Sequence, residues 1–202
     1  ENAFRLVTDA AGMALGLDPT LPEPYVALSA PASWERRRNT ALTLYRRAIA
    51  IRPSFATAYQ WLGTDTMMAG DPQAALAALD RASELDPRSL VVANNRAYVL
   101  LAVGRVADAR ATCERVLAFA PDHRGCQIRV AFAEMLRGDP EAARSYLHAI
   151  ARTGDGSALP LVDEVVDALK GRGDRRATAQ RLAAFTGRSS LDPTSGNIFA
   201  TA

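Results

Sequence analysis

Proline recurs in this sequence at a fixed interval. Pro19, Pro53, Pro87 and Pro121 follow one another at steps of 34 residues. A local turn favours proline at one position but does not set such a distance. A supersecondary unit repeated along the chain does set it, because every copy then ends in the same way. The spacing therefore predicts a repeat protein whose units are 34 residues long.

The unit that ends at Pro87 shows what one repeat contains. Its first part, TAYQWLGTDTMMAG, places apolar residues three or four positions apart, which predicts a helix with one buried stripe. Gly70, Asp71 and Pro72 then supply a C-terminal cap, an N-cap and the first residue of a second helix. The same three residue types recur at 138–140. Each repeat is thus expected to be a pair of antiparallel helices.

Small residues are expected where the two helices of a pair cross. Gly63 and Ala75 are examples, since short side chains let two backbones approach closely. A single pair leaves one apolar face uncovered, and only the next pair covers it. About a fifth of the chain is alanine, the best helix former, which agrees with an all-α stack of helix pairs. Pro31 is an exception, because a proline inside a first helix should kink or end it.

These features resemble the tetratricopeptide repeat (TPR). The matching residues of the central unit are Tyr59, Leu62, Gly63, Ala75, Leu79, Ala82 and Pro87. The resemblance implies a right-handed superhelix, an α-solenoid of about five antiparallel helix pairs preceded by an N-terminal helix. The implied pairs are residues 22–53, 56–87, 90–121, 124–153 and 158–185, in a single domain of residues 1–185. Residues 186–202 form a tail that is interpreted as the start of a further repeat.

The resemblance also implies a concave groove lined by the first helices. The expected groove residues are Gln60, Thr64, Asn94, Asn95, Tyr98, Ile128, Arg129 and Phe132. Amide, aromatic and aliphatic side chains of this kind suit an extended or helical peptide. Ordinary packing of Tyr98 and Phe132 is the alternative. Some family members grip a terminal carboxylate with two lysines, two asparagines and an arginine. Only Asn95 and Arg129 match that set, so binding of that kind is not expected.

The cysteines and histidines offer little chemistry. Cys113, His123 and Cys126 give three metal ligands at most, whereas a zinc site takes four, so no metal site is expected. Catalysis by a Cys/His pair is the least favoured reading, because no orienting group accompanies it. Cys113 and Cys126 fall where neighbouring pairs pack in this architecture, so we consider a disulfide between them, with two reduced thiols as the alternative. No catalytic residue or cofactor is expected, since phosphate-loop and nucleophile motifs are absent from the sequence.

Charge and hydropathy argue against two classes of partner. The formal net charge at pH 7 is +2, and basic residues cluster only at 36–38, so nucleic acid is not expected as a partner. No stretch approaches the roughly 20 apolar residues that a membrane-spanning helix needs. We therefore expect no membrane contact by this segment.

Residues 54–95 are similar to a narrower group, the C-terminal repeat modules of bacterial CadC-like transcriptional regulators and of certain adenylate cyclases. The shared marks are ATAYQWLG and ELDPRSL. This similarity implies the regulatory or sensing module of a bacterial signalling or transcription-regulatory protein. Such a module is periplasmic if the whole protein is membrane-anchored, and otherwise cytoplasmic. The expected function is a non-enzymatic scaffold that binds a protein or peptide. Homo-oligomerisation, as a homodimer joined by apolar helix faces, is the alternative.

Overall fold

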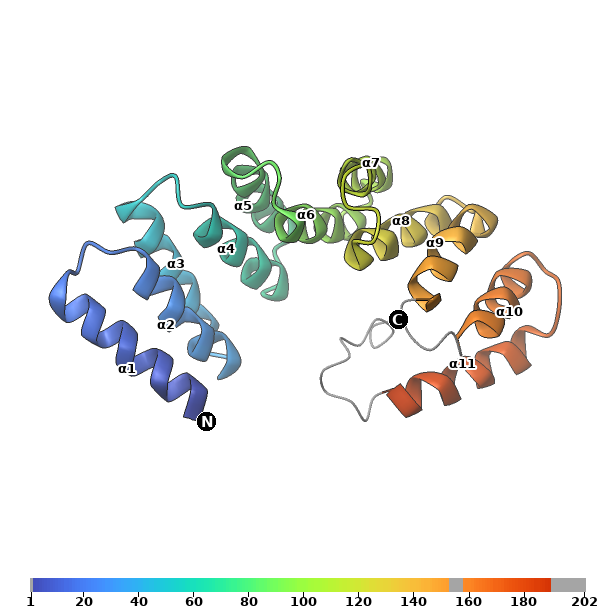
Figure 1. Ribbon diagram of the computed structural model, residues 1–202, viewed down its shortest axis with the longest axis horizontal. Helices are drawn as coiled ribbons and strands as arrows, with labels where there is room; N and C mark the ends of the chain where they lie inside the picture. The colour runs from blue at the N-terminus through green and yellow to red at the C-terminus, as the bar shows by residue number, and fades with distance from the viewer. Residues whose placement is uncertain (1, 153–157, 190–202) are drawn as a thin grey trace. The chain divides into compact units, whose positions relative to one another are not determined.

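The computed structural model describes residues 2–152 and 158–189, and these ranges contain helices and no strand (Figure 1). The all-α fold class is therefore confirmed. The helices are α1 (Asn2–Leu17), α2 (Glu23–Trp34), α3 (Arg38–Ile51), α4 (Ala56–Met68), α5 (Pro72–Leu85), α6 (Leu90–Ala102), α7 (Val106–Leu117), α8 (Arg124–Leu136), α9 (Pro140–Arg152), α10 (Leu159–Leu169) and α11 (Arg175–Ser189). None of these described helices is both long and apolar enough to cross a bilayer.

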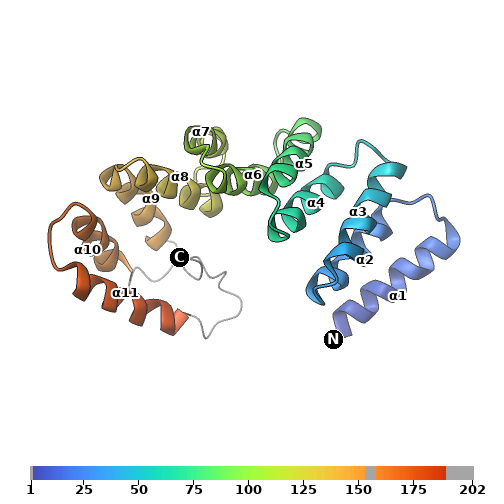
Figure 2. The same cartoon turned by 180° about the vertical axis from the view of Figure 1, so that it is seen from behind.

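The chain divides into two compact units, Glu1–Arg129 and Val130–Ala202, and each is described by itself. In the first unit, every helix from α1 to α6 packs on the next one along the chain (Figures 1 and 2). The first helices of successive pairs also touch, α2 with α4 and α4 with α6. In the second unit, α10 packs on both α9 and α11. A single domain over residues 1–185 stays a prediction.

The repeated prolines lie just beyond the ends of helices. Helices α1, α3 and α5 each end two residues before their proline, and α7 ends four residues before Pro121. Arg52 and Asp86, which precede two of these prolines, have φ/ψ of −132°/93° and −137°/80°. A residue before proline avoids the helical region for steric reasons, so the helix stops there. Pro53 and Pro87 thus fix where α3 and α5 end.

A residue with left-handed backbone angles follows the first helix of each of four successive pairs. These residues are also 34 positions apart. Gly70, Gly104 and Gly138 have φ of 89°, 77° and 80°. Arg36 fills the same place in the first pair, with φ of 58°. Glycine adopts this conformation without strain, whereas a residue with a Cβ atom does not. The first helix pair therefore keeps the left-handed conformation at this turn with arginine in place of glycine.

Aspartate side chains begin two of the second helices, as predicted from the Gly-Asp-Pro motif. Asp71 accepts a hydrogen bond of 3.0 Å from the backbone nitrogen of Ala74. Asp139 accepts one of 2.9 Å from the backbone nitrogen of Ala142. Each carboxylate satisfies a backbone amide that has no partner within the helix.

Small residues bring the helices of a pair close together. A Cβ atom at Gly63 would lie 2.6 Å from Cγ of Leu79 and 3.0 Å from the backbone oxygen of Ala75. Helices α4 and α5 therefore cross where Gly63 and Ala75 were predicted to allow it. Around this crossing the buried core is rich in alanine. The fully buried alanines of the first unit include Ala41, Ala48, Ala58, Ala75, Ala82, Ala97 and Ala109.

Pro31 does not end its helix, and a kink at this position stays a prediction. Pro31 lies inside α2, which continues to Trp34. Pro31 and the next residue, Ala32, are both buried. A proline at this position removes the hydrogen bond that its nitrogen would donate to the carbonyl four residues earlier, and burial of the ring offsets part of that loss.

Candidate functional site

Helices α4 and α6 carry a chain of polar side chains that the sequence assigned to the groove. Nδ2 of Asn95 donates a hydrogen bond of 3.2 Å to Oγ1 of Thr64. Nδ2 of Asn94 donates to Oδ1 of Asn95 at 3.3 Å. The hydroxyl of Thr64 donates to the backbone oxygen of Gln60 at 3.0 Å. The two amides and the hydroxyl are therefore tied into one network across the two helices.

Asn94 also lies against the beginning of α8. A Cβ atom at Gly125 would come within 2.6 Å of Asn94 Oδ1, so a side chain there would push the Asn94 amide from its position. Oδ1 is buried and has no hydrogen-bond partner in the part of the chain that the structure describes. Buried acceptors without partners are uncommon and call for an explanation. Here close packing against the start of α8 holds the amide in place.

Arg129 stacks on Tyr98. The guanidinium carbon lies 4.8 Å from the centroid of the Tyr98 ring, within the range of a cation–π interaction. Burial lowers the pKa of Arg129, but a guanidinium stays protonated in proteins. No carboxylate among the described residues pairs with it, and its buried Nε has no hydrogen-bond partner. Tyr98 is itself 41% exposed, so an aromatic face and an unpaired cation meet solvent together.

Three predicted groove residues take no part in the contacts described above. Gln60 is only 7% exposed, so it is buried in the stack, where α4 is flanked by α2 and α6. Ile128 is half-buried beside Arg129 in α8. Phe132 is half-buried in the second unit and stays a predicted groove residue.

The remaining residues form what we call the Tyr98 cluster: Thr64, Asn94, Asn95, Tyr98 and Arg129. It combines amide and hydroxyl hydrogen-bonding groups, an exposed ring and a cation whose charge is not neutralised. A peptide backbone offers amide hydrogens and carbonyl oxygens that match such groups. The groups that the cluster offers are those that form hydrogen bonds and cation–π contacts.

Cys113 and Cys126 lie together and are free thiols in the structure. Both are fully buried, Cys113 in α7 and Cys126 in the first turn of α8. The hydrogen bond that they share, together with burial, raises the pKa of Cys113, and the same hydrogen bond lowers the pKa of Cys126. The neighbourhood of the two thiols was expected from the architecture, and a disulfide between them stays a prediction.

His123 contacts Cys126 through the backbone. Its ring nitrogen Nδ1 accepts a hydrogen bond from the backbone nitrogen of Cys126 at 3.1 Å. A histidine that activates a cysteine needs to reach the sulfur instead. The position next to Cys126 is therefore explained by helix capping.

A second polar group, which the sequence analysis did not single out, centres on Asp65 in α4. Its Oδ2 atom accepts hydrogen bonds from the hydroxyls of Tyr45, at 3.1 Å, and of Ser33. These residues are far apart in the sequence and come from three helices. The only signal available beforehand was an acidic residue within an otherwise apolar helix stretch, DTMM after Gly63 and Thr64.

The comparisons with known proteins agree with this architecture. A tetratricopeptide-repeat family model matches residues 66–128. Comparison with curated proteins gives no significant match. The fold is similar to that of PilF from Pseudomonas aeruginosa, with a TM-score of 0.74 and 22% identity over 96% of this chain and 86% of that one.

Two further solved structures are similar at comparable levels. PilW, described as a widely conserved type IV pilus biogenesis factor, has a TM-score of 0.75 and 19% identity, covering 94% of this chain and 88% of its own. YrrB, described as a TPR protein with an unusual peptide-binding site, has a TM-score of 0.68 and 18% identity, covering 87% of this chain and 90% of its own. The fold of the described residues is therefore similar to that of solved tetratricopeptide-repeat proteins, and residues 66–128 match the tetratricopeptide-repeat model.

Proposed function

We propose that this protein is a non-enzymatic binding module and that the Tyr98 cluster holds a segment of a partner protein. The observation that carries this proposal is the Arg129–Tyr98 pair. A guanidinium that pairs with no carboxylate of residues 2–152 or 158–189 stacks on a ring that is 41% exposed. Neutralising that charge with an acceptor from a ligand would stabilise the bound state, because charge-assisted hydrogen bonds are among the stronger ones.

The amides of the cluster support the same role. Asn94 and Asn95 are held by each other and by Thr64, so little side-chain freedom is lost when a ligand binds. An amide fixed in this way suits hydrogen bonds to the backbone of an extended segment rather than to a particular side chain. YrrB, whose fold is similar, is described as having a peptide-binding site, which makes this use of the fold a reasonable one.

The proposal is tested by selecting peptides from a random display library and measuring their affinity for two variants. Tyr98→Ala removes the exposed ring of the cluster. Phe119→Ala is the matched control, because Phe119 is also an exposed ring with an arginine over it, Arg88 at 5.7 Å, but lies outside the cluster. We expect Tyr98→Ala to weaken binding about tenfold or more and Phe119→Ala to leave it unchanged. Equal affinities for the two variants would refute the proposal.

A second candidate function, self-association, is supported by the surface of α1. Leu6, Met13 and Leu17 are 61%, 72% and 87% exposed on this one helix. Large apolar side chains gathered on a surface favour contact with another apolar surface. The test is light scattering across a range of protein concentrations, with Met13→Glu as the variant. A concentration-dependent mass that Met13→Glu abolishes supports a homodimer through α1, and a constant monomer mass argues against it.

We also propose, from the resemblance of residues 54–95, that the module serves a bacterial signalling or transcription-regulatory protein. In that role the Tyr98 cluster would bind a segment that changes with the signal. A reporter assay in a bacterial host, comparing the intact regulator with its Tyr98→Ala and Phe119→Ala variants, tests this role. Loss of the response with Tyr98→Ala alone supports it, and an unchanged response contradicts it.

A further inference from the structure

A pocket of about 660 Å³ lies in the first unit, on the side of α2 that faces α1 and α4. Apolar groups from these helices form most of its wall. The lining residues used below are Phe4, Trp34, Trp61, Met68, Arg38 and Asp65. The pocket shares no residue with the Tyr98 cluster. Both tryptophans of the chain line it.

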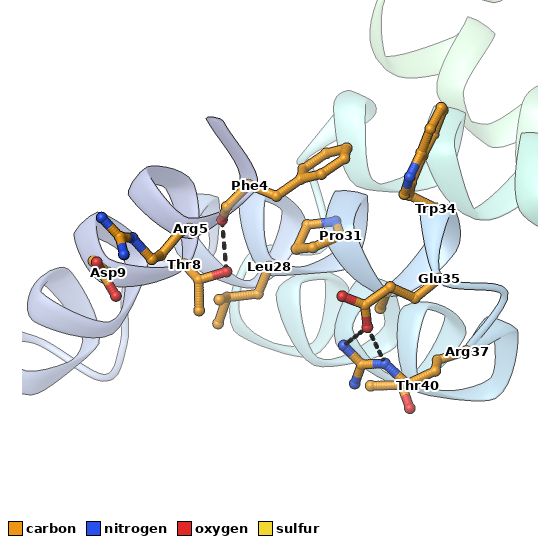
Figure 3. A pocket seen from close by; sticks show the side chains of 11 residues that line it. Phe4, Arg5, Thr8, Asp9, Leu28, Pro31, Trp34, Glu35, Arg37 and Thr40 are labelled. Carbon is orange, nitrogen blue, oxygen red and sulfur yellow. Dashed lines mark hydrogen bonds and ion pairs between the residues drawn. The ribbon is translucent and has the colours of Figure 1, made fainter. Parts of the chain in front are cut away.

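The rim of the pocket is aromatic and exposed. Trp34 is 76% exposed, Trp61 44% and Met68 62%. The Phe4 and Trp34 rings lie 5.8 Å apart, tilted by 42°. These two rings, seen in Figure 3 between α1 and the end of α2, also border a neighbouring pocket. Exposed rings around one hollow are a feature of binding sites, since folding alone favours covering them.

A carboxylate lies in the same pocket. Asp65 is half-buried, and its Oδ2 atom is oriented by the hydroxyls of Tyr45 and Ser33. Burial raises the pKa of Tyr45, so its hydroxyl stays a neutral donor and leaves the charge on Asp65. The other oxygen, Oδ1, makes no hydrogen bond to the described part of the chain, and no ion pair there includes Asp65. The pocket therefore holds an oriented negative charge with no cationic partner.

Arg38 is the one basic residue among those that line the pocket. It begins α3, is exposed, and takes part in none of the ion pairs found in the described ranges. Arg38 does not pair with Asp65, so a ligand cation can bind there. The positive charge of Arg38 near the rim nevertheless repels such a cation. Removing that charge is therefore expected to favour a cationic ligand.

We propose that this pocket binds the side chain of an arginine presented by a partner peptide. A guanidinium is planar, so it stacks on indole faces such as those of Trp34 and Trp61. Its N–H groups reach a carboxylate in a fixed geometry, which suits the open Oδ1 of Asp65. The alkyl stem of the arginine then packs against Met68 and Phe4. Aromatic walls and a lone carboxylate together favour a cation over an apolar side chain, which would leave Asp65 desolvated and unpaired.

The test uses two capped pentapeptides that differ only at the central residue, arginine in one and citrulline in the other. Citrulline has nearly the same shape without the charge. Tryptophan fluorescence reports binding directly, because both tryptophans line the pocket. We expect the arginine peptide to change the fluorescence and to bind about tenfold more tightly than the citrulline peptide.

Variants then assign the effect to the pocket. Asp65→Asn should reduce the preference for arginine to about twofold or less, and Arg38→Gln should strengthen arginine binding. Tyr98→Ala should change neither, which separates this site from the Tyr98 cluster. Circular dichroism of each variant checks its fold, and the arginine–citrulline comparison on the unaltered protein holds even if Asp65→Asn fails to fold. Equal affinity for the two peptides, no fluorescence change at millimolar arginine peptide, or a preference that a folded Asp65→Asn variant retains would each overturn the proposal.

Discussion

The Nδ1 atom of His123 caps α8 by accepting a hydrogen bond of 3.1 Å from the backbone nitrogen of Cys126. The backbone oxygen of His123 accepts from Gln127 at 3.1 Å, so the residue stands at the N-cap and its side chain serves the amide three residues further on. A ring nitrogen that accepts a hydrogen bond is unprotonated. Burial lowers the pKa of His123 from its ordinary value of 6.5, which keeps the ring in this form.

This cap predicts a loss of stability at acid pH. Unfolded His123 takes up a proton as the pH falls through 6.5, whereas the folded protein resists until its lowered pKa is reached. The stabilisation is fully present above pH 6.5 and is lost progressively below it. His123→Asn keeps a capping oxygen but does not titrate. Urea unfolding between about pH 5 and 7.5 measures the free energy of unfolding of both proteins. As the pH falls, the unaltered protein should lose up to about 1 kcal/mol relative to His123→Asn. Two curves that stay parallel would contradict this assignment.

Arg36→Gly should stabilise the protein. Arg36 has a φ of 58° where the next three repeats have glycine. Relief of the left-handed strain outweighs the greater freedom of glycine in the unfolded chain, for a net gain of about 0.5–1 kcal/mol. The reverse change, Gly104→Arg, should cost a similar amount. Thermal unfolding measures both, and a lower melting temperature for Arg36→Gly would show that the arginine is held favourably by other contacts.

Gly63→Ala should destabilise the first unit. The added methyl group would lie 2.6 Å from Leu79 Cγ, so α4 and α5 would have to move apart, at a cost of about 1–3 kcal/mol. Gly12→Ala is the matched control, because Gly12 lies inside α1 with open space around it. That change should stabilise by up to about 1 kcal/mol through helix propensity. Denaturant unfolding of both variants tests the close crossing, which would be refuted if both gained stability.

Cys113 and Cys126 should form a disulfide when the protein is treated with a mild oxidant such as diamide, which takes up their two hydrogen atoms. Both thiols are buried and share a hydrogen bond, so the sulfurs are already neighbours. After oxidation, iodoacetamide should label neither cysteine in denaturant until a reductant is added. Cys113→Ser serves as the control, since its lone thiol should stay available. Labelling of both thiols in the oxidised protein would show that their geometry forbids the bond.

The sequence predicted those features that depend on residues within one repeat. Pro53 and Pro87 fixed two helix ends because the residues before them, Arg52 and Asp86, leave the helical region. Asp71 and Asp139 cap helices by accepting a hydrogen bond from the backbone nitrogen three residues further along the chain. The hydrogen bond between Asn95 and Thr64 could also have been predicted, because the repeat spacing places neighbouring first helices side by side.

Features that depend on which distant residues meet were not predictable in this way. Asp65 gains its role only when Ser33 and Tyr45, from two other helices, approach it. Gln60 matched a surface position by spacing, yet the packing of α4 between its neighbours buries it. The left-handed Arg36 was missed because arginine gives no local sign of that conformation, although the 34-residue step from Gly70 points to it.

The most direct test of the central claim is to locate a bound peptide on the surface. A photoreactive benzoylphenylalanine is placed at position 98 or, as the control, at position 119, and each protein is irradiated with a peptide selected on the unaltered protein. Mass spectrometry then identifies any adduct. The account predicts capture of the peptide from position 98 and none from position 119. Capture from position 119 alone, or equally from both, would contradict binding at the Tyr98 cluster.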